Sequence, residues 1–120
     1  MKRTSSKKPR KQRRFRRKAE LHLRKNLLKV HISKELKKKL KTRKRTILVN
    51  KGDRVRLITG SRKGHEGRVI DVDYKRLKIY IEGISRVNSR GNDNPIPIDP
   101  SNVELIDGNF NKDRLRILNR

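Results

Sequence analysis

The sequence lacks cysteine and tryptophan and has few aromatic or acidic residues. Its 120 residues include no Cys, no Trp, 3% aromatic and 30% hydrophobic residues. Without cysteine there is no disulfide scaffold, thiol nucleophile or thiolate metal site, which is typical of a reducing compartment. No apolar run approaches the ~20 residues that cross a bilayer, and the N-terminal residues lack the apolar stretch of a secretory signal. We therefore expect a protein that stays inside the cell and has no membrane partner.

Metal-binding and catalytic sites are not indicated either. His22, His31 and His65 are the only histidines, and their spacing does not match a metal-ligand set. The best acid pair for Mg²⁺-assisted phosphodiester cleavage is Asp71 and Asp73, but in an alternating strand both would point onto a solvated face. No nucleophile with a supporting base can be assembled from the other residues. The sequence predicts no enzyme, no catalytic residue, no cofactor, no metal and no small-molecule substrate.

Positive charge is abundant and concentrated near the N-terminus. The chain has 37 Lys+Arg and 12 Asp+Glu; residues 1–51 hold 23 basic and 2 acidic residues (23 − 2 = +21), and residues 52–120 hold 14 and 10 (14 − 10 = +4). So much self-repulsion favours phosphate binding, because each neutralised phosphate releases counterions. A solvated tail, a nuclear import signal and a solubility device are the alternatives. A membrane-surface helix would need an apolar face opposite the basic one, and only Phe15 interrupts the most basic stretch.

The basic extension, residues 1–45, divides into three parts. Residues 2–18 contain one aromatic residue and no acid, so we expect them to be disordered without a partner. From Glu20 to Val30, leucines recur with loose helical spacing, which predicts a short helix. A second helix is indicated by a capping residue, an acid in the first turn and two leucines one turn apart: Ser33, Glu35, Leu36 and Leu40. Residues 41–45 read as a basic connector.

From residue 46 the periodicity becomes two. Alternating apolar residues predict short strands near residues 54–57, 69–72, 77–81, 96–98 and 103–105, with turn residues between them. Strands at near-regular spacing without intervening helices favour a mainly β fold, a small antiparallel barrel over residues 46–107. Residues 108–120 form a short tail that can be helical. The predicted barrel core consists of Val55, Leu57, Val69, Val72, Leu77, Ile79, Ile81, Val103 and Leu105.

A glycine-rich loop separates the first two long strands of the predicted barrel. Residues 59–67 read TGSRKGHEG, and glycine lets backbone amides approach a partner closely. The spacing does not match a Walker motif and the loop opens a strand, so nucleotide binding is disfavoured. We expect Gly60 and Gly67 to serve the geometry of the turn. The side chains predicted to be displayed at the tip as phosphate contacts are Arg62, Lys63 and His65.

These residues resemble a known family. KGDRV at 51–55, Gly60, KGHEG at 63–67, Val69 and Val72 look like a KOW motif. The segments that extend the similarity are KPRKQR at 8–13, HLR at 22–24, HISKEL at 31–36, KRLKIYIEG at 75–83 and PIDPSNV at 97–103. Together they make the chain similar to the KOW-domain large-subunit ribosomal proteins, number twenty-four in the universal naming, in their archaeal and eukaryotic form.

The resemblance implies an SH3-like barrel whose basic N-terminal extension binds large-subunit ribosomal RNA in its 5′ domain. It also implies an early role in subunit assembly, a position near the exit of the nascent-chain tunnel, and other large-subunit ribosomal proteins as neighbours. The expected location is the cytoplasmic ribosome, with nuclear transit in a eukaryote. A KOW-type transcription elongation factor and a nonspecific nucleic-acid-binding protein are the alternatives; the latter would bind duplex DNA as well as RNA at equal salt.

We expect the extension to fold on RNA, its arginines binding phosphates and Phe15 stacking on a base, while the glycine-rich loop adds selectivity. The candidate RNA-binding residues of the extension are Lys7, Lys8, Arg10, Lys11, Arg13, Arg14, Phe15, Arg16, Arg17, Lys18, His22, Arg24 and Lys25. Those of the barrel are Lys51, Arg62, Lys63, Gly64, His65, Lys75 and Arg76.

Overall fold

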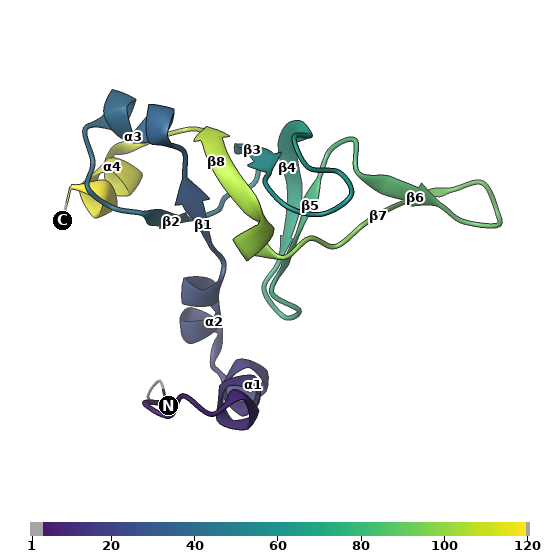
Figure 1. Ribbon diagram of the computed structural model, residues 1–120, viewed down its shortest axis with the longest axis horizontal. Coiled ribbons are helices and arrows are strands. Elements are labelled where there is room, and N and C mark those ends of the chain that lie inside the picture. Colours follow the sequence, from purple (N-terminus) through teal and green to yellow (C-terminus); the bar gives the residue numbers. More distant parts are fainter. Residues whose placement is uncertain (1–3, 120) are drawn as a thin grey trace.

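The computed structural model describes residues 4–119 and has a small, mainly β fold with a helical N-terminal extension (Figure 1). One sheet has six strands in the order β2-β1-β8-β3-β4-β5, and a second sheet pairs β6 with β7. The strands are β1 (Lys29–Ile32), β2 (Thr46–Leu48), β3 (Arg54–Leu57), β4 (Glu66–Asp73), β5 (Lys78–Ile81), β6 (Ser85–Val87), β7 (Asp93–Pro95) and β8 (Val103–Asp107). The prediction of a small, mainly β domain is confirmed.

Pairing in the large sheet is antiparallel except between β1 and β8, which run parallel. Within the part of the chain that the structure describes, the edge strands β2 and β5 are not paired with each other, so the sheet is open rather than a closed barrel. The strand predicted at residues 96–98 is reduced to a single bridge between Ile98 and Ile79. The predicted strand at 77–81 begins one residue later, because Leu77 has a φ of 58° and belongs to the preceding turn.

Four α-helices and one 3₁₀ helix accompany the sheets among the described residues. In Figure 1, α1 and α2 descend from the sheet towards the N-terminus, whereas α3 and α4 lie beside β1 and β2. Ser33 caps α3 as predicted, since its hydroxyl oxygen accepts a 3.2 Å hydrogen bond from the Leu36 N–H. The helices are α1 (Pro9–Lys18), α2 (Leu21–Leu27), α3 (Lys34–Leu40), η1 (Pro100–Asn102) and α4 (Lys112–Leu118).

All nine predicted core residues are buried, with exposed fractions of 8% or less. Val69 and Val72 are three residues apart, and a regular strand would place them on opposite faces. The register shifts between Val69 and Asp71, which is a β-bulge. The bulge turns both valines inward and leaves Ile70 exposed on the outer face.

The core also draws on residues assigned to the extension. β1 lies between β2 and β8, where His31 pairs with Thr46 on one side and Glu104 on the other. Its alternate residues Val30 and Ile32 are buried. The core members from this part of the chain are Leu28, Val30, Ile32 and Leu36. The sheet therefore reaches outside residues 46–107, and α3 is part of the folded body.

The C-terminal helix α4 is held to the sheet by a buried ion pair. The Arg114 guanidinium donates through Nη1 to Asp53 Oδ1 at 2.8 Å and through Nη2 to Asp53 Oδ2, and both side chains are at least 94% buried. Nη2 also donates to the Leu48 carbonyl at 3.0 Å. Asp53 comes from the KGDRV segment of the KOW-like motif, so the acid of that motif has a structural role here.

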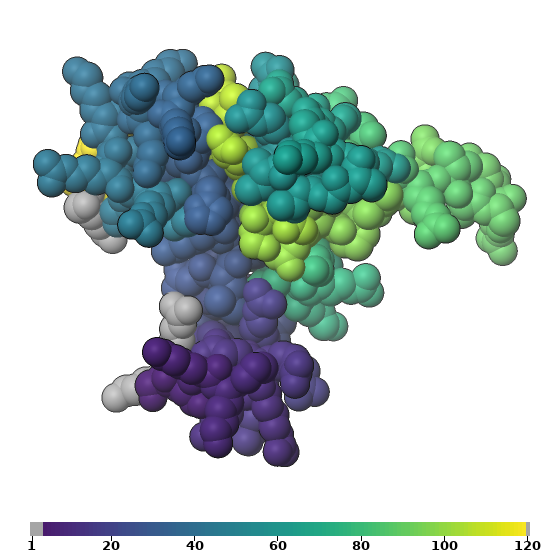
Figure 2. Space-filling view, in the orientation of Figure 1, coloured from purple at the N-terminus to yellow at the C-terminus, as the bar shows by residue number. Residues whose placement is uncertain are grey.

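The β6–β7 hairpin projects from the body (Figures 1 and 2). Both strands are largely exposed, including Val87 at 63%. Its tip is ordered by the Asn88 side-chain oxygen, which accepts from the N–H groups of Arg90 and Asn92 at 3.0 Å. Isolated two-stranded hairpins are only marginally stable, so the tip geometry and the hydrogen bond from the Ile96 N–H to the Ile84 carbonyl at its base hold this one together.

Candidate nucleic-acid interface

Helix α1 is the most basic element of the structure. Seven of its ten residues are Lys or Arg, and none is acidic. Pro9 stands in the first turn, where its fixed φ suits a helix start, and Phe15 is buried. The helix differs from the disorder that we expected for residues 2–18. Burial of the Phe15 and Ala19 side chains, each about 5% exposed or less, gives this segment a contact that its composition did not indicate.

The charges of α1 repel one another. Residues three and four apart are neighbours on a helix, and like charges at that spacing cost ~0.2–0.5 kcal/mol per pair. Arg10, Arg14, Arg17 and Lys18 alone line a shallow groove of about 400 Å³ on its surface. All seven cations of α1 are exposed, and none of them forms an ion pair with a carboxylate within residues 4–119. The helix thus presents a dense row of uncompensated guanidinium and ammonium groups.

Arg24 joins α1 to the body of the protein. Its guanidinium donates to three backbone carbonyls: Nε to Ala19 at 2.8 Å, Nη2 to Arg17, and Nη1 to Lys75 at 3.0 Å. The first two close the C-terminal end of α1, where carbonyls lack helical partners, and the third reaches the turn between β4 and β5. Arg24 was predicted to bind RNA; in the structure three of its five N–H donors bond to the protein itself.

Lys25 reinforces the same junction. Its ammonium lies 5.7 Å from the centre of the Tyr74 ring, within the range of a cation–π contact. Tyr74 begins the β4–β5 turn, where the Asp73 carboxylate accepts from the N–H groups of Lys75 and Arg76. The turn therefore has a fixed backbone, and its two exposed cations, Lys75 and Arg76, project beside the extension.

The glycine-rich loop displays only part of what was predicted. Lys63 and Gly64 are exposed, as is Arg62, whose Nη2 donates to the Ser85 carbonyl at 3.3 Å. The prediction that His65 is displayed at the tip is wrong. The His65 ring is half-buried, and its Nε2 lies 3.1 Å from the Glu82 carbonyl oxygen, which can only accept. His65 therefore donates to the protein backbone and fastens the loop to the end of β5.

Two glycines make room for this arrangement. A Cβ on Gly83 would lie 3.0 Å from the His65 ring, and the φ of Gly83 is +82°. A Cβ on Gly67 would lie 2.7 Å from the Glu82 carbonyl oxygen. The prediction that Gly67 serves backbone geometry is confirmed, because β4 and β5 approach too closely for a side chain. Gly60 also serves the turn, with a φ of +91°.

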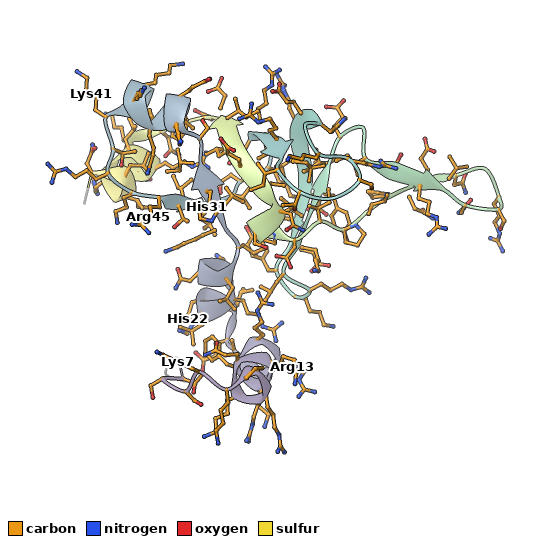
Figure 3. The ribbon with its side chains drawn as sticks, viewed as in Figure 1. Lys7, Arg13, His22, His31, Lys41 and Arg45 are labelled. Carbon is orange, nitrogen blue, oxygen red and sulfur yellow. The ribbon has the colours of Figure 1, made fainter. Side chains whose placement is uncertain are left out.

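The remaining candidates are scattered. His22 is exposed, with Nδ1 3.4 Å from Glu20 Oε2, and Figure 3 shows it on α2, between the labelled Lys7 and Arg13 and the sheet. Lys51 is ion-paired with Asp71 at 3.1 Å. Lys7 and Lys8 are exposed just before α1 and continue its row of cations.

Three cations of the large sheet, unlike those of α1, are paired with acids: Arg54, Arg56 and Lys78. Arg56 lies between two carboxylates, with Nη2 3.3 Å from Glu104 and Nη1 3.8 Å from Glu66. Arg54 also reaches Glu66 at 3.2 Å, and Lys78 reaches Asp99 at 3.4 Å. The pairs of Arg54 and Arg56 join neighbouring strands of the sheet, whereas Asp99 lies just before η1. The positive charge that is left for a partner therefore lies outside these pairs.

Two of the acids have lowered pKa values. The hydrogen bond from the Lys51 ammonium, followed by that from the Val72 N–H, holds the pKa of Asp71 below its ordinary value. Partial burial would raise the pKa of Asp99, but hydrogen bonds from Ser101 and the charge of Lys78 outweigh it, so this pKa is lowered as well. Asp71 and Asp73, the pair weighed for Mg²⁺, are thus engaged by a lysine and by turn amides respectively.

Within residues 4–119 no group of three or more acidic or histidine side chains is placed to hold a metal ion. No helix in the same range is both long and apolar enough to span a bilayer. What these residues offer is a mainly β body that pairs several cations of its sheet with acids, and a helix α1 whose cations form no such pairs. This combination is characteristic of the small basic proteins of ribonucleoprotein particles.

Comparison with known families agrees with this class. Residues 6–120 match the family of ribosomal proteins described as L26 in eukaryotes and L24 in archaea. The match covers nearly the whole sequence, and the chain belongs to this family. The resemblance inferred from the KOW-like motif is confirmed, and membership makes the chain a structural constituent of the large ribosomal subunit rather than a transcription elongation factor.

Proposed function

We propose that the chain binds large-subunit ribosomal RNA through its basic extension, with α1 as the main contact. The observation that carries the proposal is the set of seven exposed cations on one ten-residue helix, none of which is paired with a carboxylate of residues 4–119. Arginine suits this role because its planar guanidinium donates two parallel hydrogen bonds to a phosphate. Five of the seven are arginines.

RNA also explains how α1 is stabilised. A helix of ten residues is marginal in isolation even with good sequence propensity, and the like charges of α1 weaken it further. Phosphates along an RNA groove would remove this repulsion and release counterions. We therefore expect α1 to gain helical order on binding, with Arg24 and Lys25 holding its C-terminal end against the β4–β5 turn.

Two further contacts follow from the placement of exposed cations. Lys75 and Arg76 lie at the turn that Arg24 joins to the extension, so an RNA bound on α1 would pass near them. Arg62 and Lys63 occupy the exposed part of the glycine-rich loop. Phosphate contacts of this kind fix register and orientation, whereas base contacts give sequence preference.

The more specific parts of the proposal, which concern the RNA domain, the assembly role, the position and the protein neighbours, rest on the family resemblance. They are binding to the 5′ domain of the ribosomal RNA, an early role in subunit assembly, a position near the exit of the nascent-chain tunnel, and contacts with neighbouring ribosomal proteins. Family membership supports a ribosome-associated, cytoplasmic location. Nuclear transit in a eukaryote is part of the proposal and follows from the import-like composition of the extension.

Competitive binding tests the proposal. The full chain would be titrated at fixed, near-physiological salt against a 5′-domain fragment of large-subunit ribosomal RNA, an unrelated structured RNA and duplex DNA of equal charge. We expect the ribosomal fragment to bind at least ~10-fold more tightly, which corresponds to ~1.4 kcal/mol. Equal affinity for all three would instead indicate a nonspecific polycation.

A pair of charge-matched variants locates the contact. Arg13, Arg14 and Arg17 changed to Gln should reduce the slope of log K against log salt by about 2–3, because each lost phosphate contact contributes ~0.7–0.9. The control changes Arg68, Arg86 and Arg90 to Gln, which removes the same charge from exposed side chains of the β4 and β6–β7 region. If both variants changed the slope equally, α1 would not be the main contact.

A further inference from the structure

A second basic surface lies at α3 and the segment that follows it. It contains eight Lys or Arg residues and a single acid, Glu35, between positions 34 and 45. We call it the α3 cluster: Lys34, Lys37, Lys38, Lys39, Lys41, Arg43, Lys44 and Arg45. Six of the eight are exposed. Within residues 4–119 none of them forms an ion pair with a carboxylate.

The backbone under the α3 cluster is fixed. α3 is capped by Ser33 and packs into the core through Leu36. After α3 the Thr42 hydroxyl donates to the Leu118 carbonyl of α4 at 2.9 Å, and its N–H donates to the Lys37 carbonyl at 3.3 Å. The Arg45 carbonyl accepts from the Ile32 N–H at 2.9 Å. The segment that reads as a basic connector is therefore a rigid loop that presents its cations from a set position.

Helix electrostatics accounts for only part of the α3 cluster. Lys37, Lys38 and Lys39 occupy the last turn of α3, where positive charge is favourable. The residues from 41 to 45 lie beyond the helix, outside the last turn in which that effect acts. Four of those five residues are cations that repel one another, and no carboxylate within residues 4–119 forms an ion pair with them. An anionic partner supplies the compensation that the chain does not.

The α3 cluster and α1 lie on different parts of the molecule. Figure 3 places the labelled Lys41 and Arg45 beside α3 and β2, and Lys7 and Arg13 at the far end of the extension, below α2. Cα extents are 46 × 39 × 23 Å, and charges are screened over about 8 Å at physiological salt. On the sheet, Arg54, Arg56 and Lys78 are paired with acids. The two basic surfaces therefore lie on separate parts of the molecule.

We propose that the α3 cluster binds a second RNA segment, so that the chain bridges two RNA helices, one on α1 and one on the α3 cluster. This inference rests on the proposed function of α1 and adds a second site to it. The fixed body between the sites would set the relative position of the two RNA segments, which is a way for a small protein to hold RNA elements together in a ribonucleoprotein particle.

A co-capture assay tests the bridge. A biotinylated short RNA duplex is immobilised, the full chain is bound to it, and a fluorescent copy of the duplex is added; retained fluorescence measures bridging. In parallel, fluorescence anisotropy measures binding of one duplex. Changing Lys34, Lys38 and Lys39 to Gln should weaken capture of the second duplex by at least ~30-fold near ~0.15 M salt, from the loss of three phosphate contacts. Binding of the first duplex should change little, since α1 is intact.

The control is the variant with Arg68, Arg86 and Arg90 changed to Gln, which loses the same charge outside both surfaces. It should bridge like the unmodified chain. A second variant, Arg43→Gln with Arg45→Gln, leaves α3 unaltered and repeats the test if the first variant unfolds, as judged by circular dichroism. Equal loss of bridging in control and test variants would overturn the inference, because only net charge would then matter.

The assay also separates the bridge from the function on which it rests. If the unmodified chain binds one duplex with an α1-dependent salt slope but captures no second duplex, the bridge is wrong and the proposed function of α1 stands. If the chain binds no RNA at all, both are wrong. Retained co-capture in the folded α3-cluster variants would place the second contact elsewhere and overturn the inference as well.

Discussion

Replacing Asp53 by asparagine should destabilise the fold more than any surface charge change. The Asp53 carboxylate accepts two hydrogen bonds from Arg114 and one from the Asn50 N–H at 2.9 Å. Asn keeps the volume and one acceptor oxygen, but it removes the negative charge that compensates a buried guanidinium. Nε of Arg114 already has no partner within the described residues, and the other groups that face the guanidinium there are the uncharged Leu48 and Asn109 carbonyls and the Phe110 ring.

The expected cost follows from the burial of the pair. Arg114 and Asp53 side chains are 6% and 2% exposed, and removing one member of a buried ion pair typically costs ~3–5 kcal/mol. Domains of this size are stable by only ~5–15 kcal/mol, so the loss is a large fraction of the total. In thermal unfolding it should lower Tm by roughly 4 °C for each kcal/mol in a chain of 120 residues.

Denaturant unfolding with two comparison variants measures this cost. Arg54→Gln breaks an ion pair whose side chains are 57% and 39% exposed, and it should cost less than ~1 kcal/mol. The double variant with Asp53→Asn and Arg114→Met keeps the acceptor for Asn50 and removes the buried charge. It should be more stable than Asp53→Asn alone, because no uncompensated cation remains. If Asp53→Asn cost no more than Arg54→Gln, the ion pair would not hold α4 to the sheet.

Three further predictions concern the extension, the glycine-rich loop and acid stability. Arg24→Gln removes a donor to three backbone carbonyls and should lower hydrogen-exchange protection of α1 amides about tenfold, or ~1.4 kcal/mol; unchanged protection would mean that Arg24 does not join α1 to the body. Gly83→Ala should cost ~1–2 kcal/mol in urea unfolding, because its φ is +82° and its Cβ would lie against His65; a neutral effect would contradict that packing. The pKa values of Asp71 and Asp99 are lowered in the folded chain, so as the pH falls these two carboxylates take up protons in the unfolded chain before they do so in the folded one. The free energy of unfolding should therefore fall as the pH drops below about 4. The double variant with both residues changed to Asn should show a flatter dependence of this free energy on pH, and an unchanged dependence would assign it to other carboxylates.

The inward positions of the sheet were predictable because period two is a direct consequence of strand geometry. All nine predicted core residues are buried, and Ser33 caps α3 as its sequence context indicated. The β-bulge could have been inferred from Val69 and Val72. Both are apolar, and a regular strand cannot bury residues three apart on the same face.

Other features had weaker sequence signals. The alternation at residues 29–32 was present, but it followed leucines with helical spacing, and four residues are too few to separate the two periods. His65 carries no local sign that its ring turns to the Glu82 carbonyl, because the partner lies 17 residues away. Arg114 looks like any other cation of a basic tail, and its acid is 61 residues earlier. Such contacts depend on tertiary packing and leave no periodic pattern.

The structure separates two uses of positive charge that the net value of +25 combines. Arg114 is buried and Arg56 lies between two carboxylates, so both contribute to the fold through acids supplied by the chain. The cations of α1 and of the α3 cluster have no such acids among the described residues, and each adds repulsion to its neighbours. Neutralising the first kind removes a stabilising contact and leaves the extension unchanged. Neutralising the second kind relieves repulsion and removes a phosphate contact. Folding stability should therefore fall at the first set with RNA affinity unchanged, whereas at the second set folding stability should rise and RNA affinity should fall.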